Sequence, residues 1–173
     1  MALTRINNQA LPTIDHSNMP SGSVLQVKQA TSTDAFTINT NDTWTDLSGL
    51  SVTITPKSTS SKILITVHLT GADDTNAYTR ILLRRDSSSI AYGDSGTGHE
   101  STFSMHGNTS AGSAEQQVGS MTWLDSPATT SATTYKLQGS CYNSRIARFN
   151  YNNGDANTRQ NTVSTITVME IAG

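Results

Sequence analysis

The stretch Lys62-Ile63-Leu64-Ile65-Thr66-Val67-His68-Leu69 decides the fold class of this chain. Ile63, Ile65, Val67 and Leu69 alternate with a second set of residues that is mostly polar. Successive side chains of a β-strand point to opposite faces, so this alternation predicts a strand whose two faces differ. The branched residues Ile, Val and Thr favour the same structure.

Similar short runs, separated by clusters of Gly, Asn, Asp and Ser, continue to the end of the sequence. Residues 78–85 are expected to form a hairpin with residues 90–92 through the turn at 86–89. About nine or ten short strands and no helix predict an all-β fold, a sandwich or a barrel. The expected strands lie at 23–28, 50–54, 62–69, 78–85, 90–92, 102–106, 117–124, 135–142, 146–151 and 164–171, and residues 36–38 give a weaker strand signal.

The composition favours one ordered domain with a thin core. The chain has 173 residues, of which 34% are hydrophobic and 14% charged, against about 25% charged in typical globular proteins. Serine and threonine account for 50 residues and supply the polar surface. The net charge is only −2, whereas disordered chains usually combine low hydrophobicity with high net charge. A thin core makes burial against partner subunits plausible.

Several protein classes do not fit the sequence. Cys141 is the one cysteine, so no intrachain disulfide and no thiol metal set is expected. A pI near 6.0 lacks the basic character of a nucleic-acid-binding protein. The first residues contain no signal-peptide core, and no apolar run reaches a membrane span. We therefore expect a protein made in the cytoplasm, without cofactor, nucleic acid or membrane partner.

Residues 1–20 are expected to form an extended N-terminal arm, and residues 21–173 the β domain. The arm carries spaced apolar residues among Asn, Gln and Pro, without a sustained period of 2 or 3.6. Another chain is the expected binding partner of such an arm. Its candidate docking residues are Leu3, Arg5, Ile6, Leu11 and Ile14.

Gly93-Asp94-Ser95-Gly96 resembles the nucleophile segment of trypsin-like serine proteases. The upstream histidines, His16 and His68, lack the sequence context of a catalytic base, so no triad is supported. Asp94-Ser95-Gly96 also fits the aspartic-protease tripeptide, but the apolar context that surrounds it in that class is absent. The interpretation is a loop rich in turn-forming residues.

Two further segments contain metal-binding residue types. His99, Glu100 and His106 could contribute imidazole and carboxylate ligands, and residues 152–157 are rich in oxygen ligands for calcium. Neither segment has the spacing of a known metal site. A surface loop and an Asx-Gly turn are the interpretations, so no metal site is predicted.

Tyr142, Arg145, Arg148 and Tyr151 combine cations with aromatic rings. This pattern is typical of sites that bind sugars or nucleic acid. A strand with one wet and one buried face gives the same pattern. A glycan site at these four residues is therefore the weaker of two interpretations.

Four segments of the sequence resemble short virion proteins of tailed bacteriophages, the capsid-decoration and fibre proteins. They are residues 1–8 (Met-Ala-Leu-Thr-Arg-Ile-Asn-Asn), 21–27, 54–65 and 165–171. The resemblance implies a jelly-roll sandwich and a homotrimer of the type found in tumour necrosis factor and the complement globular head. In that fold the last strand is central, which places Met169 and Ile171, or Ile166 and Val168, in the core or the trimer interface. Tyr135 and Leu137 are expected in the same core or interface.

The resemblance leads to a functional expectation, a non-enzymatic decoration (cement) protein that binds the major capsid protein on the virion surface. The main alternative is a tail- or head-fibre tip that recognises a host surface glycan. A polysaccharide-cleaving virion enzyme is a third alternative, but such enzymes need paired carboxylates in a groove. The few acidic residues of this chain lie mostly in expected turns.

Overall fold

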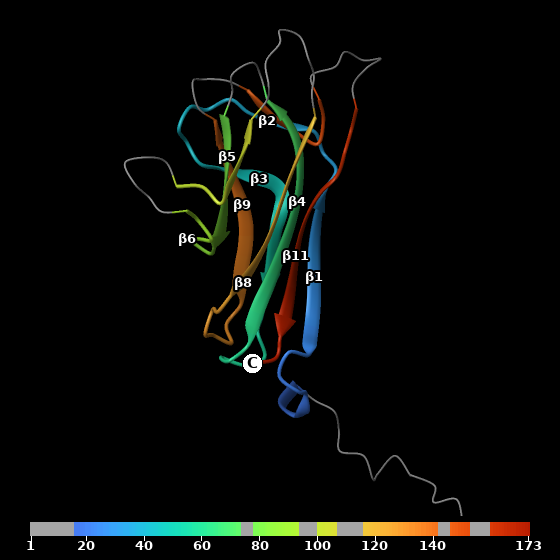
Figure 1. Ribbon diagram of the computed structural model, residues 1–173, viewed down its shortest axis with the longest axis vertical. Helices are drawn as coiled ribbons and strands as arrows, with labels where there is room; N and C mark the ends of the chain where they lie inside the picture. The colour runs from blue at the N-terminus through green and yellow to red at the C-terminus, as the bar shows by residue number, and fades with distance from the viewer. Residues whose placement is uncertain (1–15, 74–77, 94–99, 107–115, 142–145, 153–159) are drawn as a thin grey trace, which may run out of the picture.

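The structure is a computed structural model that describes residues 16–73, 78–93, 100–106, 116–141, 146–152 and 160–173 (Figure 1). These residues form two antiparallel sheets packed together, so the predicted all-β sandwich is confirmed. The described part of the chain contains no helix with the length and hydropathy of a membrane span. The elements are η1 (His16–Asn18), β1 (Val24–Ser32), β2 (Phe36–Ile38), β3 (Thr45–Ile54), β4 (Lys62–Asp73), β5 (Tyr78–Arg85), β6 (Ser88–Ile90), β7 (Phe103–His106), β8 (Gln117–Asp125), β9 (Thr133–Cys141), β10 (Ala147–Phe149) and β11 (Ser164–Ile171).

The first sheet, sheet A, is organised around β4. One edge of β4 pairs with β8 over residues 63–71. The other edge pairs with β11 over residues 62–68 and then with β10 over residues 71–73. β1 pairs with the far edge of β11, and β2 with the far edge of β10. Sheet A is therefore four strand positions wide, with β8 at one rim and β1 and β2 at the other.

The second sheet, sheet B, has the order β3, β9, β5. The outer edge of β5 pairs with β7 over residues 78–81 and with β6 over residues 83–85. Along the chain, consecutive strands pass repeatedly from one sheet to the other. These crossings between the two antiparallel sheets make the domain a β-sandwich.

Alternation of side chains supplies the core between the sheets. Ile63, Ile65, Val67 and Leu69 of β4 are buried, whereas Thr66 and His68 between them are exposed. The last strand alternates in the same way. The core also contains Leu50, Val52, Ile54, Ile81, Leu83, Tyr135, Leu137, Phe149, Ile166 and Val168.

Several strand boundaries differ from those expected: β1 extends to Ser32, β4 extends to Asp73, and β6 covers Ser88–Ile90, so the hairpin turn is 86–87 and not 86–89. For two further strands, local backbone geometry accounts for the difference. β3 begins at Thr45 and not near Leu50, because Gly49 adopts a φ of +76° and lets the strand bulge. β10 ends at Phe149 and not at Tyr151, because Asn150 adopts a φ of +61°.

Asn150 is fully buried and joins the segments around the end of β10. Its side-chain amide donates to the Ser32 hydroxyl at 3.0 Å and to the Asp34 carbonyl at 3.0 Å. Its side-chain oxygen accepts from the Ser164 hydroxyl at 2.5 Å. These bonds compensate for the burial of the polar amide. They tie the end of β10 to the end of β1 and to the start of β11.

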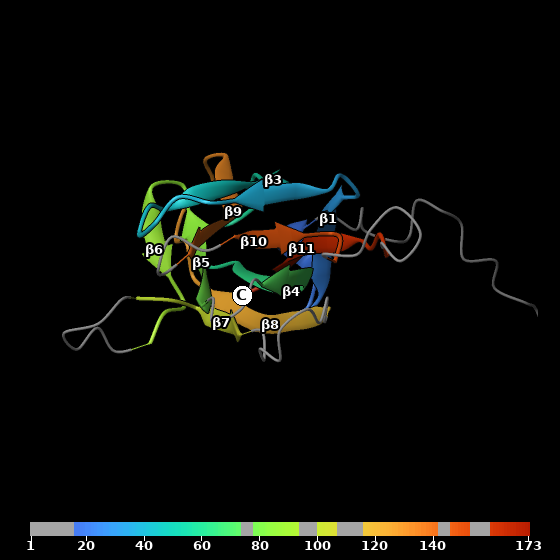
Figure 2. The same ribbon diagram turned by 90° about the horizontal axis from the view of Figure 1, so that it is seen from above.

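The two sides of the sandwich are closed differently (Figure 2). On the β1–β3 side, Lys28 donates to the Thr53 carbonyl at 2.9 Å and Gln26 donates to the Thr55 carbonyl at 2.8 Å. The opposite side is formed by β7 and β8. At the lower end in Figure 1, the backbone of Gly22 bonds to Ala172, so residues that follow the expected arm lie beside the last residues of the chain.

Candidate interaction surface

The outer face of sheet B is covered by polar side chains that bind one another. Asp46 accepts from Lys136 at 2.8 Å and from Gln138 at 2.6 Å. Gln138 in turn accepts from Arg84 at 2.8 Å. The hydrogen bond from Lys136 is the main reason that the pKa of Asp46 lies below its usual value.

Arg80 continues this network on β5. Its guanidinium donates to the Asp42 carboxylate at 2.5 Å and to the Ser140 hydroxyl at 3.1 Å. It also lies over the Trp44 ring, 5.6 Å from the ring centroid. Two ion pairs on this face, Lys136 with Asp46 and Arg80 with Asp42, are thus formed within the subunit.

The outer face of sheet A is of a different kind. Cross-strand pairing aligns Val27 of β1, Met169 of β11, Leu64 of β4 and Leu124 of β8 in one row across the sheet. Val27 is 55% exposed and Leu124 is 54% exposed, and the two central residues are half-buried. An apolar row crosses the whole width of this face.

Uncharged residues also fill the neighbouring rows of this face. The next row contains Gln29, Thr167, Thr66 and Thr122, and the row beyond it contains Thr31, Thr165, His68 and Ser120. On β1, β4, β8 and β11, the titratable side chains in these outward positions are Lys62 and His68. A large face with few charges and an apolar row is typical of a protein–protein interface.

The register of β11 decides where the predicted trimer-interface and core residues lie. Ile166 and Val168 point into the core with Tyr135 and Leu137, and all four are fully buried. Met169 and Ile171 point outward on sheet A and are half-buried. The sequence did not decide which of these two alternating pairs of residues is buried. The structure places Met169 and Ile171 at the surface and Ile166 and Val168 in the core.

The other predicted residues are only partly within the described structure. Arg148 and Tyr151 are half-buried near the end of β10, whereas Tyr142 and Arg145 lie outside the described residues. Also outside are the docking residues Leu3, Arg5, Ile6, Leu11 and Ile14, the protease-like residues 94–96, and His99. Within the described ranges, no three His, Cys, Asp or Glu side chains are grouped to hold a metal ion.

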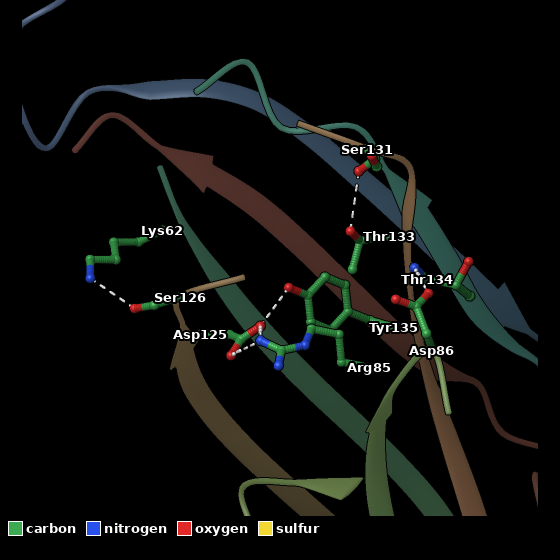
Figure 3. Close-up of polar contacts among 9 residues, drawn as sticks. All are labelled: Lys62, Arg85, Asp86, Asp125, Ser126, Ser131, Thr133, Thr134 and Tyr135. Carbon is green, nitrogen blue, oxygen red and sulfur yellow. Dashed lines mark hydrogen bonds and ion pairs between the residues drawn. The ribbon is translucent and has the colours of Figure 1, made fainter. Parts of the chain in front are cut away.

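A buried polar clamp attaches β8 to sheet B (Figure 3). The Tyr135 hydroxyl of β9 donates to the Asp125 carboxylate at 2.7 Å, and Arg85 of β5 donates to both carboxylate oxygens at 3.0 Å. Burial, reinforced by the bond to Asp125, raises the pKa of the Tyr135 phenol above its usual value. The phenol therefore stays protonated and acts as a donor.

Replacement of Tyr135 by phenylalanine tests this clamp. Tyr135→Phe removes one donor from a carboxylate that is buried, so we expect a loss of about 1–3 kcal/mol in the free energy of unfolding. Urea denaturation measures it. Tyr92→Phe, which removes the hydroxyl of a tyrosine that is 45% exposed, is the matched control and should change stability little.

A second buried carboxylate lies on β11, next to the rim strand β1. Glu170 of β11 is fully buried and accepts from the Gln26 side chain at 2.5 Å and from the Lys57 backbone amide at 2.6 Å. Burial by itself would raise the pKa of Glu170, but the hydrogen bonds outweigh it and the pKa is lowered. The charged carboxylate holds the β3–β4 connection against β1.

The lowered pKa of Glu170 predicts the pH dependence of stability. A carboxylate with a lower pKa in the folded state stabilises the fold above its unfolded pKa and loses this contribution as pH falls through the folded pKa. Between pH 6 and pH 3, the free energy of unfolding should therefore decrease more for the natural protein than for Glu170→Gln. Urea denaturation at each pH measures this free energy. An equal decrease in the two proteins over this range would contradict the assigned role.

A shallow cavity of about 260 Å³ lies near this end of the sandwich. Its lining includes His16 of η1, Leu25 of β1, Lys57 and Ser58 of the β3–β4 connection, and Gly173. Residues from the beginning and from the end of the described chain, such as His16 and Gly173, thus line the same cavity. It contains no grouped carboxylates, because its polar lining consists of histidine, lysine and serine side chains.

Comparison with known proteins leaves the chain without an assigned family. No protein-family model matches it, and no curated protein matches it. The surface chemistry of the described residues is therefore the main guide to function.

Sequence reasoning did not identify the outward-facing apolar residues Val27, Leu64, Val118 and Leu124. Two signals were available. Leu64 interrupts the polar set of β4, which otherwise contains Thr66 and His68. In β8 both alternating sets contain apolar residues, so neither face of that strand is clearly a solvent face.

Proposed function

We propose that this protein is a structural subunit of a virus particle, a bacteriophage capsid-decoration protein that associates as a homotrimer. The observation that carries the proposal is the outer face of sheet A, which has few charges and an apolar row. The resemblance of four sequence segments to phage decoration and fibre proteins supplies the biological setting. Partners would be two further copies of the chain and the major capsid protein.

The contrast between the two outer faces supports self-association. Sheet B carries ion pairs within the subunit, as between Lys136 and Asp46. Sheet A offers Val27, Met169 and Leu64, which gain free energy when water is removed from them. A closed ring of identical contacts buries such a face in every copy without leaving an exposed end.

The position of the last strand agrees with the trimer that the resemblance implies. β11 is central in sheet A and presents Met169 and Ile171 outward. In jelly-roll trimers of the tumour necrosis factor type, residues beside the last strand bury against sister subunits. The outer face of β11, β4 and β1 is therefore the proposed three-fold interface.

Several acidic residues of the described structure act as structural groups, which supports a role without bond chemistry. Asp125 is held by Arg85 and Tyr135, and Glu170 by Gln26. Asp46 binds Lys136 on an open sheet surface. Glycoside cleavage requires two carboxyl groups that face a shared groove, and these three carboxylates lie in separate bonding networks.

A fibre-tip role that recognises a host surface glycan is the second candidate. The favouring observation is the presence of partly exposed aromatic residues: Tyr78 is 47% exposed, Tyr92 is 45% exposed, and Tyr151 is half-buried close to Arg148 in the sequence. Aromatic faces beside a cation suit a sugar ring. The two roles differ in copy number, as tested below.

The proposed three-fold interface is tested by Leu64→Glu. The natural protein should have a native mass of three times the 18.5 kDa subunit. A glutamate at this position would be buried without a partner at the interface, and we expect association to weaken at least about 100-fold. Native mass spectrometry or sedimentation measures the mass of the natural protein and of the variant.

The matched control is Thr53→Glu, which introduces the same charge on exposed Thr53 of sheet B. It should leave the trimer intact. A natural protein that remains monomeric at micromolar concentration, or a Leu64→Glu variant that associates normally, would contradict the proposed interface.

The capsid role is tested in purified particles. Hundreds of copies per particle are expected for a decoration protein, whereas a few tens or fewer would indicate a fibre tip. Deletion of residues 2–15 should leave a folded trimer that no longer binds particles, because the arm is the proposed capsid-docking segment. Quantitative mass spectrometry and co-sedimentation measure these quantities; unchanged binding after the deletion would overturn the role of the arm.

A further inference from the structure

β8 is a long edge strand that is left without a neighbour on one side. Its nine residues pair with β4 through one edge, and no strand within the described ranges pairs with the other edge. Figure 2 shows β8 at the rim of its sheet. An edge of this kind presents backbone donors and acceptors that can pair with another chain.

β8 lacks the features that protect edge strands from pairing. At the other rim of sheet A, Lys28 of β1 donates to the Thr53 carbonyl near the end of β3, and Gln26 donates to the Thr55 carbonyl just after it. β8 has no charged side chain from Gln117 to Leu124. Lysine, proline and short length are the usual means of keeping an edge unpaired, and none of them is present in this segment.

Three of the large apolar side chains exposed on the described surface belong to β8. Val118 is 63% exposed, Leu124 is 54% exposed and Trp123 is 43% exposed. Val118 and Leu124 point outward from sheet A, since they pair with Thr70 and Leu64 of β4. Trp123 belongs to the opposite set, with Gly119 and Met121. Both faces of the strand therefore carry apolar surface at this rim.

The sequence of β8 is complementary to itself when two copies are antiparallel about Met121. In this register Val118 lies opposite Leu124, Gly119 opposite Trp123, and Ser120 opposite Thr122. Apolar residues thus meet apolar residues, and a hydroxyl meets a hydroxyl, which are favourable cross-strand pairs.

The Gly119–Trp123 pair places a large side chain opposite a residue that has none. Gly119 has no side chain, and the Phe103 ring already lies over it on the inner side, where an added Cβ would be 2.4 Å from a ring carbon. A large indole opposite a glycine meets no Cβ across the strand pair. The partner's indole would therefore meet the Phe103 ring that covers Gly119.

We propose that β8 is a self-association strand that pairs with β8 of a second copy across a two-fold axis at Met121. The pairing would join two copies of sheet A into one continuous sheet. It would end before Asp125, whose carboxylate is already bound by Arg85 and Tyr135. Because the pairing surface is a strand edge, this contact is separate from the proposed three-fold interface and does not depend on it.

The size of the contact indicates where it would operate. Seven paired residues bury less surface than a stable interface of about 1,200–2,000 Å² requires, so the contact is weak between free molecules. Copies that are already held side by side on a particle experience a high effective concentration. Two-fold contacts of this kind would connect neighbouring oligomers laterally.

Disulfide trapping tests both the contact and its register. A Val118→Cys protein mixed with a Leu124→Cys protein should form a cross-linked heterodimer under mild oxidation, because opposite Cα atoms in an antiparallel pair lie about 4.5–5.5 Å apart. Both positions are exposed, so the substitutions should not impair folding. The natural Cys141 is buried and should not react.

Each variant alone provides the control. In the proposed register, the introduced thiols of two Val118→Cys copies, or of two Leu124→Cys copies, would be about 20 Å apart, six residues along the strand. Neither protein alone should therefore cross-link above background. A mixture that cross-links at least tenfold faster than either protein alone supports the pairing. Equal rates in all three samples, or no cross-link in the mixture, would overturn it. The trimer is tested separately, by the native mass of the natural protein.

Discussion

The pairing of β4 on both of its edges is the constraint on which the rest of the structure depends. β8 binds one edge, and β11 and then β10 bind the other. Because side chains alternate along a strand, this pairing sets which residues of all four strands enter the core. Ile63, Ile65, Val67 and Leu69 fill the interior, and a shift by one residue would place polar Thr66 and His68 there instead.

Buried polar groups secure the ends and rims of this arrangement. Asn150 joins the end of β10 to residues around Ser32, Glu170 holds the β3–β4 connection against β1, and Asp125 attaches β8 to sheet B. Each group would be costly to bury without its partners, so each favours one arrangement of the strands over the alternatives. The hydrophobic core supplies most of the driving force, and these contacts specify how the strands meet.

The difference between the two outer faces connects the fold to the proposed role. Sheet B carries ion pairs within the subunit, Lys136 with Asp46 and Arg80 with Asp42. Sheet A presents a face with few charges and an unprotected edge at β8. A three-fold contact through the face and a two-fold contact through the edge would use different parts of one sheet. Identical subunits with two kinds of symmetric contact can form an extended layer, which suits a protein that reinforces a capsid.

The sequence by itself determined the fold class and most strand positions, because period-two alternation and turn residues are local properties. It predicted the alternation in β4 and the last strand near residues 164–171. The tertiary structure decided which alternating set of the last strand is buried, since Ile166 and Met169 are both apolar and only pairing with β4 distinguishes their directions. It also decided that Leu64, Val27 and Leu124 form one row, because these residues are distant in sequence and meet only through cross-strand register.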